Sequence, residues 1–395
     1  MTIDLYDRES WRGGAPHAAF AELRRTDPVH WQDIPGQAGY WAVLRHADVV
    51  SASRQPAVFS AEKGGILLED LDPEPLAQLR SMLLAMDPPK HQRHRRPLTV
   101  PFGKPQIATL EKRVRDICRD ILAGVPDGAP VDLVHDVASP LPTRVLGEVL
   151  GLPENDWDHL HEKAALSART IGESADHEGL AAVAALAVYA MEHAARRRLE
   201  PPRDDVTSLM LASEIDGKVM DDLEFALQFV QLFIAGNDTT VGMLANGLDV
   251  LLDHPDQLAA VRAEPELVAG AVEEIVRYAG PLHYFRRTAL VDTELGGKQI
   301  RAGDKVGLYY VSANRDEAVF PDPDRFDVRR TNNKHVAFGF GEHFCLGIHL
   351  ARLEGRVFFE ELLATFSRIE RAGEPVKIHS NFNNGLDLLP VTLHR

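Results

Sequence analysis

The amino-acid sequence predicts one mostly α domain of the α+β class that spans residues 1–395. Apolar residues recur at helical spacing from about residue 105 to 200, and one helical pattern continues unbroken from Asp221 to about Asp253. No internal repeat or low-complexity linker divides the chain. Segments rich in aromatic and β-branched residues predict a smaller β-rich part, drawn mainly from about residues 25–60, 280–312 and 375–395.

The elements follow one another along the chain with recognisable boundaries. The first hundred residues mix an amphipathic helix, PHAAFAELRR, with two strand candidates, PVHWQ and GYWAVL. Helices follow, with breaks at VPDGAP and GLPEND, and Asp216 and Gly217 then predict a tight hairpin turn. Asp221 is a suitable N-cap for the longest helix, which we expect to cross the whole molecule and to end before His254. Beyond it we expect a helix around AVEEIVRY, strands at RRTALV and KVGLYYV, a proline-rich loop at FPDPDRFD and a last helix at LARLEGRVFFEELLATF.

The composition excludes several classes of function. A net charge of −16 argues against a nucleic-acid partner, because phosphate binding needs a basic surface. Two cysteines cannot build a disulfide framework or a four-cysteine metal site. The sequence has no HExxH, no dinucleotide-binding fingerprint and no P-loop. The polar N-terminus, MTIDLYDRESWRGGAPH, and the lack of a long apolar stretch predict a cytoplasmic protein without a membrane anchor.

The segment HVAFGFGEHFCLGIHLARLE carries the strongest chemical signal. Phe338, Gly341, Cys345 and Gly347 form the frame F-x-x-G-x-x-x-C-x-G, in which glycines let the backbone approach a flat cofactor closely. A helix that begins at about Leu346 would point its N-terminal amides at the sulfur and favour the thiolate. The alternative is that the cysteine is a small buried hydrophobic residue, as Cys118 in VRDICRDIL is expected to be.

The middle of the longest helix contains FIAGNDTT, a run of poor helix formers. Gln231, Ala235 and Thr239 lie four residues apart and share one face, which Ile234 and Asp238 flank. An acid beside an alcohol, at a turn whose hydrogen-bond ladder opens locally, could deliver protons to a bound group. The alternative is a helix kink with a capped hydroxyl.

Two further pairs of charged residues, taken alone, do not indicate a functional site. Glu274 and Arg277 lie three apart in AVEEIVRY, where an exposed pair contributes only a few tenths of a kcal/mol. His91 and Arg95 lie four apart in DPPKHQRHRR, and each alone is typical of a solvated surface.

Together these motifs, in the order DPPKH, AGNDTT, EEIVR, PDRF and the cysteine loop, resemble the cytochrome P450 family of haem-thiolate monooxygenases. The resemblance extends over nearly the whole chain, and the length and lack of an anchor are similar to the soluble bacterial members. It implies the cytochrome P450 fold, in which the long distal helix crosses a helix-rich domain with a smaller β-rich part.

The resemblance also implies a cofactor, haem b, with Cys345 as the axial ligand of its iron. Asp238 and Thr239 would be the catalytic pair that manages the protons needed to activate O₂. Glu274 and Arg277, joined by Arg325 of PDRF, would form a structural cluster beneath the haem. His91, Arg95, Arg287 and His343 would neutralise the haem propionates, and the full set of cofactor-binding residues would be His91, Arg95, Ala235, Arg287, Phe338, Gly339, His343, Cys345 and Gly347.

The implied reaction inserts an oxygen atom into a C–H bond of a hydrophobic small molecule, with steroids, terpenoids or alkyl chains favoured. A ferredoxin, with its reductase, would supply electrons to a monomeric enzyme and dock on a basic cluster made of Arg93, Arg95, Arg96, Arg352 and Arg356. A peroxygenase that uses H₂O₂ directly is the first alternative, although Asp238 and Thr239 weigh against it; a non-catalytic haem sensor or carrier is the second. By family position the substrate pocket would be lined by Gln231, Ile234, Ala235, His283, Phe285 and Phe382.

Overall fold

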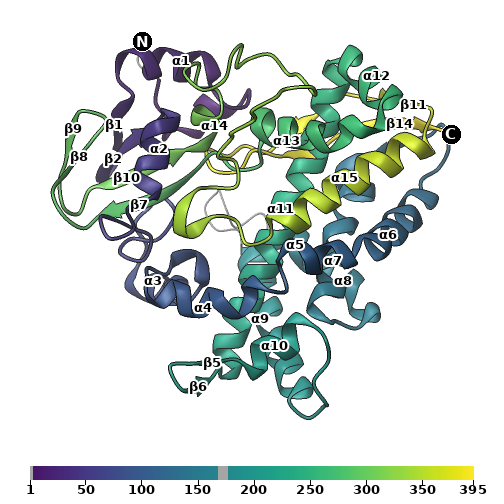
Figure 1. Ribbon diagram of the computed structural model, residues 1–395, viewed down its shortest axis with the longest axis horizontal. Helices are drawn as coiled ribbons and strands as arrows, with labels where there is room; N and C mark the ends of the chain where they lie inside the picture. The colour runs from purple at the N-terminus through teal and green to yellow at the C-terminus, as the bar shows by residue number, and fades with distance from the viewer. Residues whose placement is uncertain (1–2, 168–176) are drawn as a thin grey trace.

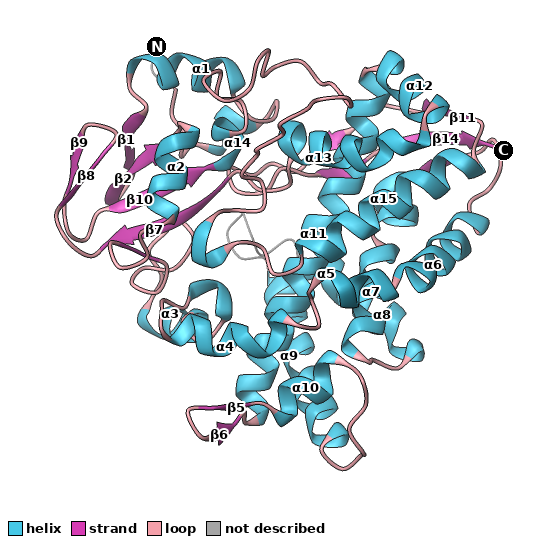
Figure 2. Cartoon of the chain, in the orientation of Figure 1, coloured by secondary structure: helices cyan, strands magenta, loops and turns pink. Residues whose placement is uncertain are grey.

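The computed structural model describes residues 3–167 and 177–395, and within them helices form most of the molecule. Figures 1 and 2 show most of the helices on one side and the main sheet, together with α1, α2 and α14, on the other. The sequence predicts this helix-rich domain with a smaller β-rich part. The helices are α1 (His17–Thr26), α2 (His46–Ser53), α3 (Pro73–Leu79), α4 (Lys90–Thr99), α5 (Lys104–Thr109), α6 (Glu111–Ala123), α7 (Pro140–Leu150), α8 (Trp157–Ser167), α9 (His177–Arg197), α10 (Val206–Ala212), α11 (Asp222–Asp253), α12 (Pro255–Ala263), α13 (Val268–Ala279), α14 (Tyr310–Ala313) and α15 (Ile348–Thr365).

The largest sheet joins strands from distant parts of the chain in the order β1-β2-β10-β7-β3. A second sheet has the order β11-β14-β4, and three pairs complete the β structure. The sequence does not predict β4, because three residues are too few for a period-two pattern. The strands are β1 (Val29–Ile34), β2 (Gln37–Val43), β3 (Phe59–Ser60), β4 (Pro130–Asp132), β5 (Glu214–Ile215), β6 (Lys218–Val219), β7 (Tyr284–Ala289), β8 (Thr293–Leu295), β9 (Lys298–Ile300), β10 (Lys305–Tyr309), β11 (Arg368–Arg371), β12 (Val376–Lys377), β13 (Leu386–Leu388) and β14 (Pro390–His394).

Helix α11 runs through the middle of the molecule, as the unbroken helical pattern predicts (Figure 1). Asp221 caps its first turn, and Glu224 returns a hydrogen bond to the Asp221 backbone to complete a capping box. The 32 residues of the helix span about 48 Å at 1.5 Å per residue. His254 and Pro255 end it where the sequence places the boundary.

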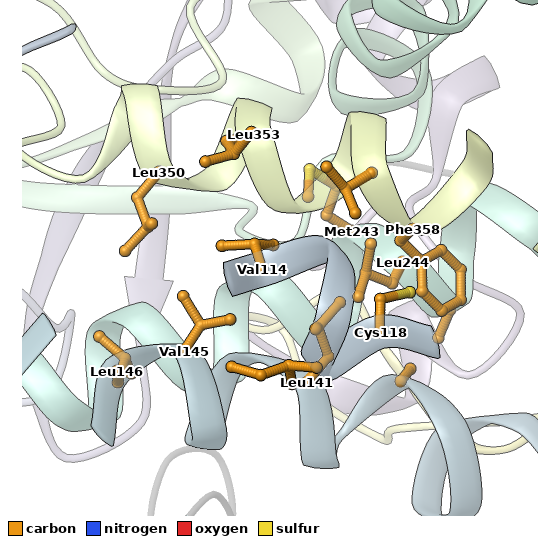
Figure 3. Close-up of a cluster of buried hydrophobic side chains, with 14 of the residues drawn as sticks. Val114, Cys118, Leu141, Val145, Leu146, Met243, Leu244, Leu350, Leu353 and Phe358 are labelled. Atoms are coloured by element: carbon orange, nitrogen blue, oxygen red, sulfur yellow. The ribbon is translucent and has the colours of Figure 1, made fainter. Parts of the chain in front are cut away.

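The main core lies where α6, α7, α11 and α15 pack together (Figure 3). Cys118 is buried in this core with 1% of its surface exposed, which confirms the core interpretation of that residue. Gly236 lets α11 approach α7, since a Cβ there would lie 3.1 Å from a methyl group of Leu146. Within the described ranges, no helix is both long and apolar enough to cross a membrane.

Candidate functional site

The central cavity lies between α11 on one side and the cysteine loop with the start of α15 on the other. The segment Leu83–Leu84, helix α4 and the chain that enters β7 close its edges. Ala235 is exposed although α11 crosses the centre of the molecule, because its side chain faces this cavity. Cys345 faces the same cavity from the opposite wall.

The cysteine loop holds its shape through a backbone hydrogen bond and two glycines in the left-handed conformation. The Cys345 N–H donates to the Phe338 carbonyl at 2.9 Å and closes the loop. Gly339 and Gly341 have φ values of 71° and 72°, in the left-handed region that favours glycine. A Cβ at Gly341 would lie 2.3 Å from the Ser53 carbonyl oxygen, so the loop can dock on α2 only with glycine there.

Burial raises the pKa of the Cys345 thiol, although the Gly347 N–H, Arg95 and Arg352 oppose that effect. The Gly347 N–H therefore favours the thiolate, as expected, but desolvation of the charged form is the larger effect.

On the opposite wall, α11 turns a different flank toward the cavity from the one that the sequence predicts. Gln231, Ala235 and Thr239 line it together, as predicted, but Leu232 and Gly236 join them in place of Ile234. Ile234 instead packs against the main core. The helix is continuous through this region, and the Thr239 hydroxyl donates to the Ala235 carbonyl at 2.7 Å. The backbone hydrogen-bond ladder therefore does not open here as predicted; instead, the Thr239 hydroxyl bonds the backbone carbonyl one turn earlier.

Asp238 lies at the end of a side-chain hydrogen-bond chain that extends away from the cavity. Asn237 Nδ2 donates to Asp238 Oδ1 at 3.1 Å, and the Thr143 hydroxyl donates to Asn237 Oδ1 at 2.8 Å. His161 Nδ1 lies 3.4 Å from the same hydroxyl. Asp238 Oδ2 is buried without a partner among the described residues, and burial raises the pKa of this carboxyl to about 7. The group can therefore exchange a proton near neutral pH.

Four cationic or polar groups gather at one edge of the cavity. The His91 and His343 rings lie 4.4 Å apart, and Arg95 donates to the Phe344 carbonyl at 2.6 Å. Burial, together with Arg287, His91 and Arg95, lowers the pKa of His343 to about 2. Arg287 is 5% exposed, and burial lowers its pKa, while its nearest acceptor is the Arg286 carbonyl at 2.8 Å. No carboxylate of the described residues forms an ion pair with Arg287.

Two of the predicted pocket residues lie behind the wall and not on it. Phe285 lines the cavity, but Phe382 packs behind it with ring centroids 5.7 Å apart. His283 is buried against Trp11, with ring centroids 4.3 Å apart. Strand β7 begins only after His283, so the alternation of faces that places Phe285 does not extend to it.

The buried ion cluster beneath the cavity contains a different arginine from the one predicted. Glu274 and Arg277 form a bidentate pair with distances of 2.7 and 2.8 Å, and both side chains are 0% exposed. Arg330 completes the cluster, with its Nε 3.0 Å from a Glu274 oxygen. Arg325 contributes only its carbonyl, and its side chain is 65% exposed. The adjacent Phe326 is buried, which directs the Arg325 side chain toward solvent.

Sequence reasoning missed one titratable residue of the cavity wall. Glu354 on α15 is 1% exposed, its Oε2 has no partner within the described part of the chain, and burial raises its pKa to about 8. Its spacing from Leu350 and Phe358, four residues to either side, would have placed it on the buried face of the helix. Most of the other unpredicted lining residues are apolar or aromatic and include Leu83, Leu84, Phe102, Leu146, Met243, Leu282 and Tyr310, and Thr240 adds a hydroxyl.

Residues 181–390 match the family model for cytochrome P450. The chain belongs to the cytochrome P450 family. It is 36% identical over 402 residues to linalool 8-monooxygenase of Pseudomonas putida, which covers 99% of this chain and 98% of that protein. It is 37% identical to steroid C26-monooxygenase of Mycolicibacterium smegmatis, over 94% of this chain and 89% of that protein. A cytochrome P450 of Mycobacterium marinum, solved in complex with pseudoionone, superimposes with a TM-score of 0.91 at 38% identity and covers 99% of this chain and 98% of its own.

This cytochrome P450 is a monooxygenase, and its family implies haem iron and O₂. The cavity fits such a cofactor on two observations. A Cβ at Gly347 would meet no protein atom within 4 Å, so the backbone beside Cys345 is bare toward the cavity. His343 Nε2 is buried without a partner in the described ranges, next to the buried cation Arg287. These groups suit the carboxylates at the edge of a haem.

Proposed function

We propose that this P450 uses haem b, held through Cys345, to hydroxylate an unactivated C–H bond of a hydrophobic small molecule with electrons from a ferredoxin. The observation that carries this proposal is the cavity, in which Cys345 faces Thr239 and Ala235 across a largely apolar space. Haem bound there supplies the oxygen activation, and thiolate ligation favours O–O bond cleavage.

The residues around the cavity have separate tasks in this proposal. His91, Arg95, Arg287 and His343 hold the propionates, which would otherwise be charged groups in a largely buried site. Gly347 leaves room for the macrocycle beside the ligand. Apolar side chains such as Leu84 and Phe285 exclude water and bind the substrate.

Asp238 and Thr239 handle the protons. Because the pKa of Asp238 is raised to about 7, its Oδ2 can bind a proton from the outside and release it toward the cavity. Thr239 lines the cavity and, through its hydroxyl oxygen, can accept a hydrogen bond there while its own proton stays on the Ala235 carbonyl.

Terpenoids, steroids and alkyl chains are the favoured substrates. The apolar lining supports this class, and two similar proteins are named as a linalool 8-monooxygenase and a steroid C26-monooxygenase. A third, solved with pseudoionone, is 38% identical to this chain.

An acidic ferredoxin would dock on the Cys345 side. Three of the predicted arginines there already pair within the chain, Arg93 with Asp216, Arg352 with Glu273 and Arg356 with Glu111. Arg96 is exposed and has no such pair within the described residues. Arg96→Glu should therefore slow reduction in a salt-dependent manner without disturbing an internal ion pair.

The class of enzyme is tested by the reduced, CO-bound protein, which should show the long-wavelength Soret band of thiolate-ligated haem. Cys345→Ala should abolish that band. The substrate class is tested by titrating the holoenzyme with terpenes, steroids, fatty acids and aromatic compounds and recording the low-to-high spin shift. Turnover that requires a ferredoxin and its reductase supports the monooxygenase, whereas efficient turnover with H₂O₂ alone would indicate a peroxygenase.

A further inference from the structure

The substrate side of the cavity contains few groups that can form a hydrogen bond. Most of its lining is apolar, and His91, Arg95 and His343 lie at the propionate edge. Besides these, the lining residues with a polar side-chain group are Gln231, Thr239, Thr240, Tyr310 and Glu354. Thr239 donates its proton to the Ala235 carbonyl. Gln231 is the amide on this wall, and it lies on the predicted cavity face of α11.

The orientation of the Gln231 amide is fixed by its neighbour. The Leu84 backbone N–H lies 3.1 Å from Gln231 Oε1 and can only donate, so the oxygen must face Leu84. The amide NH₂ group therefore points the other way. Among the described residues, no protein group accepts a hydrogen bond from Nε2, and both Gln231 and Leu84 line the cavity.

One turn earlier, a second glutamine performs the same anchoring task outside the cavity. Gln228 Nε2 donates to the Ser81 carbonyl at 2.7 Å, and Gln228 is 4% exposed. Gln228 does not line the cavity. The two glutamines thus attach the segment Ser81–Leu84 to α11, but only Gln231 retains a donor that a ligand can use.

We propose that Gln231 selects substrates that carry a hydrogen-bond acceptor, a hydroxyl or carbonyl oxygen, at the end remote from the C–H bond that is oxidised. This inference rests on the proposed function, because it takes the Asp238–Thr239 pair as the mark of the reacting end. Gln231 precedes Thr239 by eight residues, which is about 12 Å along the helix at 1.5 Å per residue. The preferred substrate is therefore an elongated apolar molecule with a polar group at one end and oxidation at the other.

The test compares decanol with decane in the holoenzyme and in Gln231→Met and Gln228→Met. Dissociation constants are measured by calorimetry and by the spin shift, and the position of oxidation is read from the products. Because a neutral hydrogen bond contributes about 0.5–1.5 kcal/mol, Gln231→Met should weaken decanol binding about 2- to 10-fold more than decane binding. It should also spread oxidation along the chain, while the wild-type enzyme oxidises decanol at the end remote from its hydroxyl.

Gln228→Met is the matched control, because it releases the same segment without removing a donor from the cavity. It should change the binding of decanol and decane by the same factor. Equal losses in Gln231→Met, or an alcohol-selective loss in Gln228→Met, would overturn the role of Gln231 and leave the proposed hydrophobic substrate class intact. A wild-type enzyme that shows the thiolate CO band but binds neither compound would overturn that substrate class and this inference with it.

Discussion

Two regions of this P450 bury acidic side chains in opposite ways. Beneath the cavity, Glu274 is 0% exposed and is paired with both Arg277 and Arg330. Glu354 on the cavity wall and Asp238, next to the lining residue Thr239, each keep one carboxyl oxygen buried without a partner in the described part of the chain. Both carboxyl oxygens of Glu274 are bound by arginine side chains, whereas burial without a partner raises the pKa of Asp238 to about 7 and that of Glu354 to about 8.

The difference separates structural from reactive use of the same chemical group. Charges that are paired on all sides hold a fixed geometry, which suits the loops that support the cysteine ligand. Unsatisfied carboxyls destabilise the fold but can gain and lose a proton at neutral pH. Substitutions in each region should therefore affect different measurements.

The largest effect on folding is expected from Glu274→Gln, which leaves Arg277 and Arg330 as buried cations without a counter-charge. Breaking such a cluster costs about 3–5 kcal/mol, so urea unfolding should shift strongly and haem incorporation should fall. Glu273→Gln is the control, because Glu273 is adjacent in sequence but is itself partly exposed, and its partners are Arg352 and His335. A similar loss in both variants would contradict the distinction.

Asp238→Asn should leave folding and the CO spectrum unchanged but lower coupled turnover. The amide cannot pass a proton, and general acid–base groups contribute about 10²- to 10⁴-fold to rate. Product formed per electron consumed, together with the solvent isotope effect, measures the loss. Asp249→Asn on the same helix, where the carboxylate is bound by Arg371, should retain coupling. Unchanged coupling in Asp238→Asn would refute the role of this acid.

Glu354→Gln should change how stability depends on pH. The folded-state pKa is raised to about 8, so the unfolded chain loses this proton first and wild-type stability falls as pH rises from about 4.5 to 8. The amide variant lacks that fall and should be more stable than wild type at pH 8, by about 1–3 kcal/mol, with little advantage at pH 4. Equal pH dependence of urea midpoints in the two proteins would show that Glu354 has a partner in the holoenzyme.

The smallest effect is expected from Thr143→Val, which removes the hydroxyl that donates to Asn237 Oδ1. Asn237 then donates less strongly to Asp238, the ionised carboxylate loses support, and the pKa of Asp238 should rise by less than about one unit. The pH profile of coupled turnover should move to higher pH by the same amount. Thr143→Ser, which keeps the hydroxyl, should retain the wild-type profile.

The sequence predicts the parts of this site that depend on local spacing. The cavity face of α11 and the cysteine loop follow from intervals of three or four residues, so Gln231, Thr239 and Cys345 lie where expected. The fold follows from the same periodicities and from the family resemblance, which the comparisons confirm.

The errors arise where tertiary packing decides. Arg325 and Arg330 are five residues apart in an irregular loop, where no periodic pattern indicates which arginine pairs with Glu274. Family position predicts His283 in the pocket, but it precedes β7 and packs against Trp11 instead. The hydrogen-bond chain from Asp238 crosses from α11 to α7 between Asn237 and Thr143. These two residues are 94 apart in sequence, so no local pattern reveals the contact.

The contact between Gly341 and Ser53 determines when the metal ligand can be positioned during synthesis. The loop that carries Cys345 rests on a helix from the first sixty residues, and the sheet beside it pairs β2 with β10. The ribosome must therefore release most of the chain before the two ends can meet, and such non-local pairing is slow to form. Haem should therefore bind late in synthesis. A truncated chain that ends before Gly347 should contain no haem.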